Sequence, residues 1–216
     1  FEYKESVVRG EHPAYSRLKV DTSWVWNTEQ GNWIKANTEC KDLQVVRPII
    51  YSEINSNKDV SGKAQFDILI FDVTPVVSSW IVEHYSEKFY YYYQFGNLEQ
   101  FMNDILEFRR PQKTVFAIKH KRDHSWLHDK RYIDFIAAKE KLGLEIVSPK
   151  QNAFEVVSQA KVVIVTPYSS PAYLAAFLNK PVIYYDAAAV LERPTWLSEN
   201  IEFINSRDEL HRRIAE

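Results

Sequence analysis

Cysteine is almost absent from this sequence of 216 residues, because Cys40 is the only one. One thiol cannot form an internal disulfide framework or a multi-cysteine metal site, and this fits a reducing compartment. Long apolar runs are also missing: no window approaches the roughly 18 consecutive apolar residues that a membrane span needs. The N-terminal stretch FEYKESVVRG lacks the apolar core of a signal peptide. We therefore expect a cytoplasmic protein.

Several motifs that would define an activity are absent. The sequence contains no GxGxxG, no GxxxxGK[ST], no GxSxG and no DxD, which argues against a dinucleotide-dependent dehydrogenase, a P-loop NTPase and a serine hydrolase. Four histidines invite a metal hypothesis, but the spacing of His84, His120, His124 and His128 matches no HExxH or similar frame. We expect neither a metal ion nor a cofactor.

A large charge of one sign is lacking as well. The net charge of −2 argues against bulk binding to nucleic acid. Charge is nevertheless uneven along the chain, because lysine and arginine outnumber acids between residues 109 and 131, and this predicts a local anion site. The first residue is Phe1 and not Met, so we expect an excised or processed piece of a longer chain.

From residue 66 onward, strand-like and helix-like segments alternate. The pattern predicts strands at 66–73, 114–121, 144–149, 161–166, 181–186 and 201–205, and helices at 97–110, 129–143, 152–160, 170–179 and 207–216. This alternation predicts an α/β fold with a Rossmann-like parallel sheet and helices on both faces. In open α/β sheets, ligands bind outside the carboxyl ends of the strands. We therefore expect the functional residues to follow the strands.

The first 65 residues have a different pattern. A strand and a helix are predicted within 19–37, and a second strand at 43–51. One such unit cannot bury both of its faces. We interpret residues 1–51 as the end of a preceding α/β domain or as an appendage, 52–65 as a polar linker, and 66–216 as the main domain.

Hydroxyl groups, cations and carboxylates follow the predicted strands. Ser169 and Ser170 precede a helix with Pro171 at an early helical position, where free backbone N–H groups and the helix dipole attract anions. An N-cap is the alternative, but two serines exceed what one cap requires, which favours a phosphate or carboxylate ligand. The candidate ligand-binding residues at this edge are Lys119, His120, Lys121, Arg122, Ser148, Pro149, Thr166, Tyr168, Ser169, Ser170, Asp186 and Glu192.

The basic stretch KHKRDH at 119–124 comes directly after a buried strand. Arginine holds an oxyanion through paired hydrogen bonds, whereas lysine acts as a point charge. A solvated loop in which Arg122 pairs with a nearby aspartate is the alternative. The aromatic run FYYYYQF at 89–95 could stack on rings or form an interface, and packing as an edge segment is the alternative there.

Three segments of the main domain resemble the C-terminal, donor-binding domain of a GT-B glycosyltransferase. They are AIKHKRD, TPYSSPAYLAAFLN and the return strand KPVIYYD. The closest group is that of the bacterial surface-polysaccharide enzymes, which includes Kdo transferases and sialyltransferases. The stretch LKVDTSWVWN followed by VVRPIIYS is similar to the end of the N-terminal, acceptor-side domain of such enzymes.

The resemblance implies positions for the donor phosphate. Lys119 with His120 stands at the HP-type position of that group, and Ser169 with Ser170 matches its serine pair. Both motifs hold the phosphate of a nucleotide-activated sugar, often a CMP sugar. Lys121 stands where the motif has proline, so UDP, GDP and CDP donors stay open.

The resemblance also implies positions for the rest of the donor. Ser148 and Pro149 stand where such proteins approach the base, and Asp186 or Glu192 where ribose or sugar hydroxyls are held. Asp186 capping the segment after it is the alternative from the residues alone.

By this resemblance the chain is the nucleotide-sugar-binding part of a metal-independent glycosyltransferase that extends a bacterial surface glycan such as capsule or lipopolysaccharide. The acceptor is then a glycan or a lipid-linked glycan, and peripheral association with the inner face of the membrane stays open. In such enzymes the catalytic base usually lies in the N-terminal domain, so we expect these residues to lack it. A GT-B-like epimerase, a polyol-phosphate transferase and a noncatalytic interaction domain that uses the tyrosines at 90–93 are the alternatives.

Overall fold

A computed structural model describes residues 19–46, 64–73, 75, 94–108, 114–120, 123–167, 169–195 and 197–216. The chain divides into two units, one formed by residues 1–60 with 192–199 and the other by 61–191 with 200–216. Among the helices in these described ranges, none has the length and apolar character required to span a membrane.

A strand-helix-strand motif makes up most of the described part of the first unit. Its elements are β1 (Lys19–Val25), α2 (Thr28–Asn37) and β2 (Glu39–Val45). The two strands pair in parallel. The second strand begins ahead of the predicted start at 43, because its polar residues pair with β1: Lys19 forms an ion pair with Glu39, and Lys41 with Asp21. The order strand, helix, strand is the predicted one.

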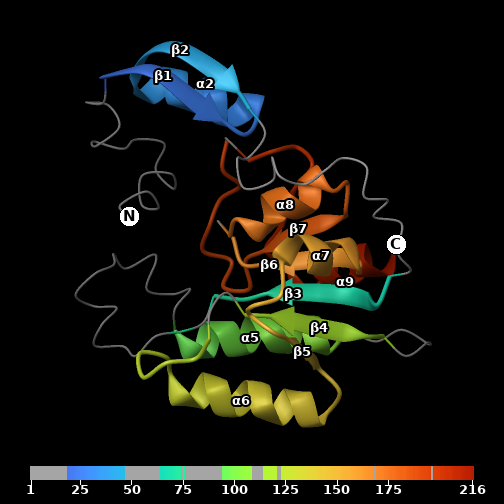
Figure 1. Cartoon of the computed structure of the whole chain (residues 1–216). Coiled ribbons are helices and arrows are strands. Elements are labelled where there is room, and N and C mark those ends of the chain that lie inside the picture. Colours follow the sequence, from blue (N-terminus) through green and yellow to red (C-terminus); the bar gives the residue numbers. More distant parts are fainter. Residues whose placement is uncertain are drawn as a thin grey trace. The chain divides into compact units, whose positions relative to one another are not determined.

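The second unit is built on a six-stranded parallel sheet in the order β5-β4-β3-β6-β7-β8 (Figure 1). The strands are β3 (Phe66–Phe71), β4 (Phe116–Lys119), β5 (Glu145–Val147), β6 (Ala160–Val165), β7 (Val182–Tyr185) and β8 (Glu202–Ile204). The chain builds outward from β3 to β5, then returns to the other side of β3 and builds outward to β8. The strand order therefore reverses between β3 and β6, which is the arrangement of a Rossmann-like fold.

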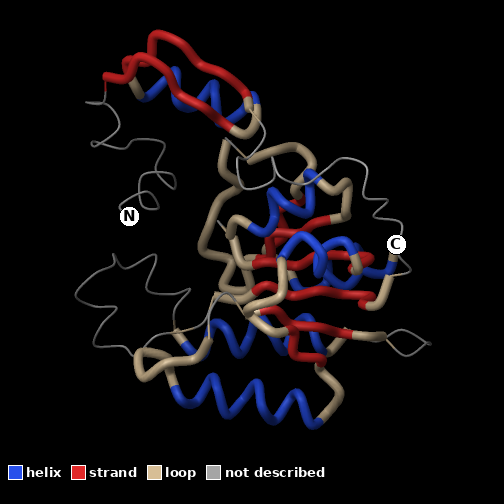
Figure 2. Tube along the Cα trace, viewed as in Figure 1, coloured by secondary structure: helices blue, strands red, loops and turns tan. Residues whose placement is uncertain are grey.

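Helices cover both faces of this sheet (Figure 2). They are α5 (Phe95–Leu106), α6 (Lys130–Lys141), α7 (Ala153–Ser158), α8 (Pro171–Phe177) and α9 (Arg207–Ala215). One face packs on α5, α6 and α9 through a cluster that includes Ile70, Ile118 and Ile164, whereas α7 and α8 lie together on the other face. The predicted α/β class with helices on both faces is confirmed.

The helix boundaries follow local chemistry with one exception. Asp129 caps α6 by accepting a hydrogen bond from the backbone N–H of Arg131 at 2.9 Å. Gly143 ends this helix with a φ of 101°, a conformation that favours glycine. The exception is α5, which was predicted to begin at residue 97. It begins at Phe95, and Gln94 at its N-cap position forms no side-chain capping hydrogen bond.

Candidate functional site

The carboxyl ends of the three central strands lie in register. Phe71 at the end of β3 pairs with Lys119 on β4 and with Val165 on β6. The residues that follow these three therefore form a row of polar side chains at the edge of the sheet, Asp72, His120 and Thr166. Since neighbouring parallel strands are about 4.8 Å apart, this row crosses the reversal point within about 10 Å. The row occupies the place where open α/β sheets bind ligands.

The side chains of this row share one face of the sheet. Side chains alternate along a strand, so each residue of the row lies on the same face as the residue two positions before it. Those residues are Ile70, Ile118 and Ile164, which belong to the cluster packed on α5, α6 and α9. Lys119 consequently lies on the opposite face, which α7 and α8 cover. The two predicted phosphate ligands Lys119 and His120 are thus separated by the sheet.

The row contains buried polar atoms without a hydrogen bond. Asp72, His120 and Thr166 are 2%, 3% and 1% exposed. Within the described ranges, Asp72 Oδ1, His120 Nε2 and Thr166 Oγ1 have no hydrogen-bond partner. Each buried unpaired polar atom costs about 1–3 kcal/mol relative to a paired one. Three such atoms in one row at the edge of the sheet make this row a candidate ligand site.

Asp72 and Tyr132 hold the other side of the His120 ring. The Nδ1 atom of His120 lies 2.9 Å from Asp72 Oδ2, and the hydroxyl of Tyr132 donates to the same carboxylate oxygen. Burial, with the neighbouring Asp72 carboxylate, raises the pKa of Tyr132 well above 10, so its phenol keeps the proton that it donates. Asp72 therefore accepts from both neighbours, and Nδ1 of His120 carries a hydrogen.

Two further imidazoles line up beside His120. The ring centroids of His120 and His124 are 4.9 Å apart, and those of His124 and His128 are 5.8 Å apart. Burial, together with His120 and His128, lowers the pKa of His124 below 6.5. At neutral pH the ring that packs on His120 is therefore uncharged.

Lys119 is a buried cation whose hydrogen bonds are largely used. Its ammonium group donates to the backbone carbonyls of Ser148 and Pro149, each at 3.0 Å. Burial lowers the pKa of Lys119 below 10.5. Two of its three N–H groups thus hold the turn after β5, which leaves one N–H for a ligand.

The serine pair stands after β6 and opens α8. Ser170 occupies the N-cap position but forms no side-chain capping hydrogen bond, and its backbone has αR geometry. Ser169 is held through its carbonyl, which accepts from the hydroxyl of Tyr184 at 2.9 Å. The capping alternative for Ser170 is wrong in this structure, because its hydroxyl does not reach the first turn of α8.

Asp186 is fully buried after β7. Its Oδ2 atom accepts a hydrogen bond from the backbone N–H of Leu191 at 2.7 Å, and this bond organises the loop that follows. This bond agrees with the alternative in which Asp186 caps the segment after it, although residues 187–191 contain no helix. Glu192 is exposed and belongs to the first unit. Lys121, Arg122 and Tyr168 lie outside the described residues, as do the tyrosines at 90–93.

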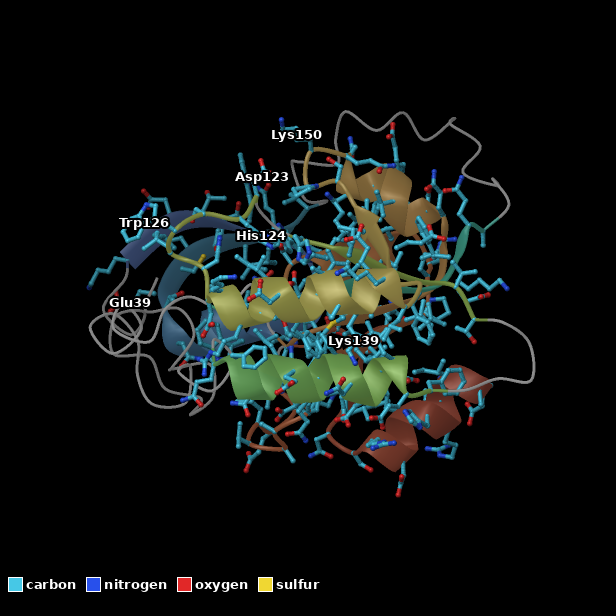
Figure 3. The ribbon with its side chains drawn as sticks, turned by 90° about the horizontal axis from the view of Figure 1, so that it is seen from below. Glu39, Asp123, His124, Trp126, Lys139 and Lys150 are labelled. Atoms are coloured by element: carbon cyan, nitrogen blue, oxygen red, sulfur yellow. The ribbon has the colours of Figure 1, made fainter. Side chains whose placement is uncertain are left out.

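A groove of about 290 Å³ runs along the second unit between α6 and β5, beside His120. Its apolar floor includes Ile136 and Ile146, and its rim includes Asp123, His124 and Glu140. Figure 3 shows Asp123 and His124 on the side of α6 away from α5, the side on which Lys150 follows β5. On the β7 side of the reversal point, a cavity lined by Thr166 has a volume of only about 10 Å³, the space of one water molecule.

Sequence reasoning located the edge but missed several residues of this site. Asp72 was visible as a polar residue after a buried strand, whereas Tyr132 lies in the apolar stripe of α6. A tyrosine in such a stripe predicts a buried hydrogen-bond partner for its hydroxyl, and this was the feature of the sequence that could have identified it. In the described part of the chain, no cluster of three or more His, Cys, Asp or Glu side chains could hold a metal ion.

The sheet order and the row at its reversal point define the second unit as a Rossmann-like α/β domain with a candidate ligand site at its carboxyl edge. The chain belongs to the family of polysaccharide biosynthesis PFTS motif proteins, since the profile of that family matches residues 2–214. Searches of curated proteins and of solved structures found no match. Membership in this family connects the chain to polysaccharide biosynthesis.

Proposed function

We propose that the chain binds the nucleotide-activated sugar donor of a glycosyl transfer reaction in polysaccharide biosynthesis. The observation that carries this proposal is the row of Asp72, His120 and Thr166, whose buried atoms lack partners at the reversal point of a Rossmann-like sheet. Family membership supports the polysaccharide part of the proposal. The GT-B resemblance of the segments around 119–124 and 161–186 supports the donor part.

The stretch Pro167-Tyr168-Ser169-Ser170 supports a site after β6. It differs from the sequence Pro-Phe-Thr-Ser, after which the family is named, by one hydroxyl on the aromatic ring and by one methyl group on the third residue. We propose that this stretch is the motif and that the hydroxyls of Ser169 and Ser170 contact the donor phosphate. Basic residues of the loop after β4, including Lys121 and Arg122, complete the phosphate contact, with the remaining N–H of Lys119 as a further donor.

The two cavity volumes favour one direction for the nucleoside. A donor whose phosphate lies at the reversal point can extend toward β7 or toward β4 and β5. The cavity beside Thr166, at about 10 Å³, cannot take a ring, whereas the groove beside His120, at about 290 Å³, approaches the size of ligand pockets. Pro149 lines this groove, which agrees with the predicted approach of Ser148 and Pro149 to the base.

The transfer itself requires stabilisation of the nucleotide phosphate as it departs. Fixed backbone N–H groups, hydroxyls and cations supply this without a metal ion, because they are already oriented toward the developing charge. Asp186 accepts a hydrogen bond from the Leu191 backbone, and a carboxylate can accept several, so the proposed contact with a sugar hydroxyl is made in addition to this bond.

A thermal shift series tests the proposal. CMP, CDP, UDP and GDP are added separately to the full chain, and one of them should raise the melting temperature, with a stabilisation of about 2.7 kcal/mol at a hundred times its Kd. The double variant S169A/S170A should lose most of this shift. Without nucleotide, its melting temperature should equal that of the wild type. Absence of a shift with all four nucleotides would exclude nucleotide binding.

A steric block tests the direction of the nucleoside. Ala137 lines the groove, and the adjacent Ala138 is also exposed on α6 but does not line it. A137W should lower the affinity for the nucleotide by at least about tenfold, because the indole fills the groove. A138W should bind the nucleotide with the affinity of the wild type. Equal affinity of both variants would place the nucleoside elsewhere.

A further inference from the structure

We infer that His120 is the general base of this site and that Asp72 and Tyr132 are the residues that position it. This inference rests on the proposed function, since it assigns the proton transfer of the same reaction. It also differs from the sequence-based expectation in two respects: His120 was assigned to the phosphate, and the base was expected outside these residues.

The hydrogen bonds of the three side chains fix the tautomer of His120. Asp72 Oδ2 accepts from the Tyr132 hydroxyl and lies 2.9 Å from Nδ1 of His120. A carboxylate only accepts, so Nδ1 is the protonated ring nitrogen, and in the neutral ring Nε2 keeps its lone pair. An imidazole held in this way by an aspartate is the arrangement by which several hydrolases activate a hydroxyl group.

The surroundings of Nε2 leave its lone pair for a ligand. This atom is buried and has no partner in the part of the chain that the structure describes. In the same described part, Oδ1 of its row neighbour Asp72 also has no partner, and the ring lines the groove between α6 and β5. His124, which packs on the ring, is neutral at neutral pH because burial lowers its pKa. His124 therefore does not oppose a positive charge on His120 during the reaction.

His120 accepts its proton during the glycosyl transfer itself. Nε2 takes the proton of an acceptor hydroxyl as that oxygen forms a bond to the anomeric carbon of the donor sugar. The bond between this carbon and the phosphate oxygen breaks, and its electron pair leaves with the nucleotide. The imidazolium, stabilised by the Asp72 carboxylate, then releases the proton to solvent.

A second histidine provides an internal control. His211 on α9 places Nε2 at 2.6 Å from the backbone carbonyl of Asp104. A carbonyl only accepts, so His211 carries its proton on Nε2. The two histidines should therefore be opposite tautomers in the same molecule.

Long-range ¹H–¹⁵N NMR spectra of the full chain with ¹⁵N-labelled histidine test the inference at neutral and mildly alkaline pH. We expect His120 as the Nδ1–H form and His211 as the Nε2–H form. D72N should abolish the pure Nδ1–H signal of His120, because an asparagine can donate as well as accept, and should leave His211 unchanged. Y132F keeps the Asp72 carboxylate and should keep the Nδ1–H form, but it removes the second donor to Asp72 Oδ2 and should therefore shift the Nδ1 proton resonance of His120, so it provides a readout if D72N does not fold.

A proton on Nε2 of wild-type His120 at neutral pH, as the other tautomer or as an imidazolium, would overturn the inference. His120 would then be expected to contact the donor phosphate, as the resemblance implied. A pure Nδ1–H signal that survives D72N would show that Asp72 does not position the ring, and a His120 Nδ1 proton resonance that Y132F leaves unchanged would show the same for Tyr132. Adding the nucleotide that stabilises the protein should move the Nε2 resonance of His120 and not that of His211. Failure of every nucleotide to bind would contradict the proposed function, while the tautomers would still decide this inference.

Discussion

The two faces of the six-stranded sheet treat their polar groups differently at the carboxyl edge. On the face covered by α7 and α8, Lys119 and Tyr184 donate to backbone carbonyls of neighbouring loops. On the face covered by α5 and α6, Asp72, His120 and Thr166 each have one buried atom without a partner among the described residues. The hydrogen bonds of Lys119 and Tyr184 hold the loops in place, whereas the three atoms on the other face hold no loop. The paired groups stabilise the fold, and the unpaired groups are the ones that we propose contact the ligand.

The largest effect should come from removing the buried cation. K119M deletes the charge-assisted hydrogen bonds to the carbonyls of Ser148 and Pro149, and each such bond contributes about 1.5–3 kcal/mol. Because both carbonyls regain water at the partly open turn, we expect a net loss of about 2 kcal/mol in the free energy of unfolding, measured by urea denaturation. K150M, at an exposed lysine on the same turn, is the control. Full stability of K119M with loss of nucleotide binding would show that Lys119 binds the ligand and does not stabilise the fold.

The cap of α6 supports the open face, because this helix carries Tyr132. D129A should lower the free energy of unfolding by about 1 kcal/mol at neutral pH. The side-chain hydrogen bond from Arg131 lowers the pKa of Asp129 below its unfolded value of 3.8. The contribution of Asp129 is therefore fully present above pH 3.8 and is lost as the pH falls through the lower folded-state value.

Urea denaturation of the wild type and D129A at several pH values checks this sign. The difference between the two proteins should shrink below pH 3.8. D129N keeps a capping side chain and removes the charge, so it should be nearly insensitive to this change of pH. A difference that grows on acidification would contradict the assignment.

Tyr184, on the face covered by α7 and α8, should have an effect about as large as that of the α6 cap. Y184F removes the hydrogen bond to the Ser169 carbonyl, and a neutral bond of this kind contributes about 1 kcal/mol. We expect that loss in the free energy of unfolding, together with weaker nucleotide binding, because the carbonyl helps to hold the serine pair. Unchanged binding would show that the serine pair does not depend on this anchor.

The smallest effect on stability, and one of opposite sign, is expected on the open face. T166V replaces an unpaired buried hydroxyl by a methyl group of the same shape, which is neutral or raises the free energy of unfolding by up to about 1 kcal/mol. Nucleotide affinity should fall at the same time. T166S keeps the hydroxyl and should keep the affinity. A stability loss in T166V would show that Thr166 belongs with the paired groups.

The sequence by itself determined the fold class and the positions of the elements. The strand at 66–71 is apolar at nearly every position because both faces of a parallel sheet are covered, and such runs alternate visibly with amphipathic helices. Asp129 and Gly143 delimit α6 by local rules that need no tertiary partner. The edge that carries the polar residues followed from the parallel arrangement alone.

Only the tertiary structure decided which of these polar residues are paired. Lys119 and His120 are adjacent in the chain and equally polar, yet alternation along β4 sends them to opposite faces with different neighbours. His120 bonds to Asp72, which lies 48 positions away along the chain, and Asp72 in turn bonds to Tyr132, which lies 60 positions from it. Hydrogen bonds depend on the positions of atoms within about 3 Å, and local sequence patterns carry no information on contacts between such distant segments.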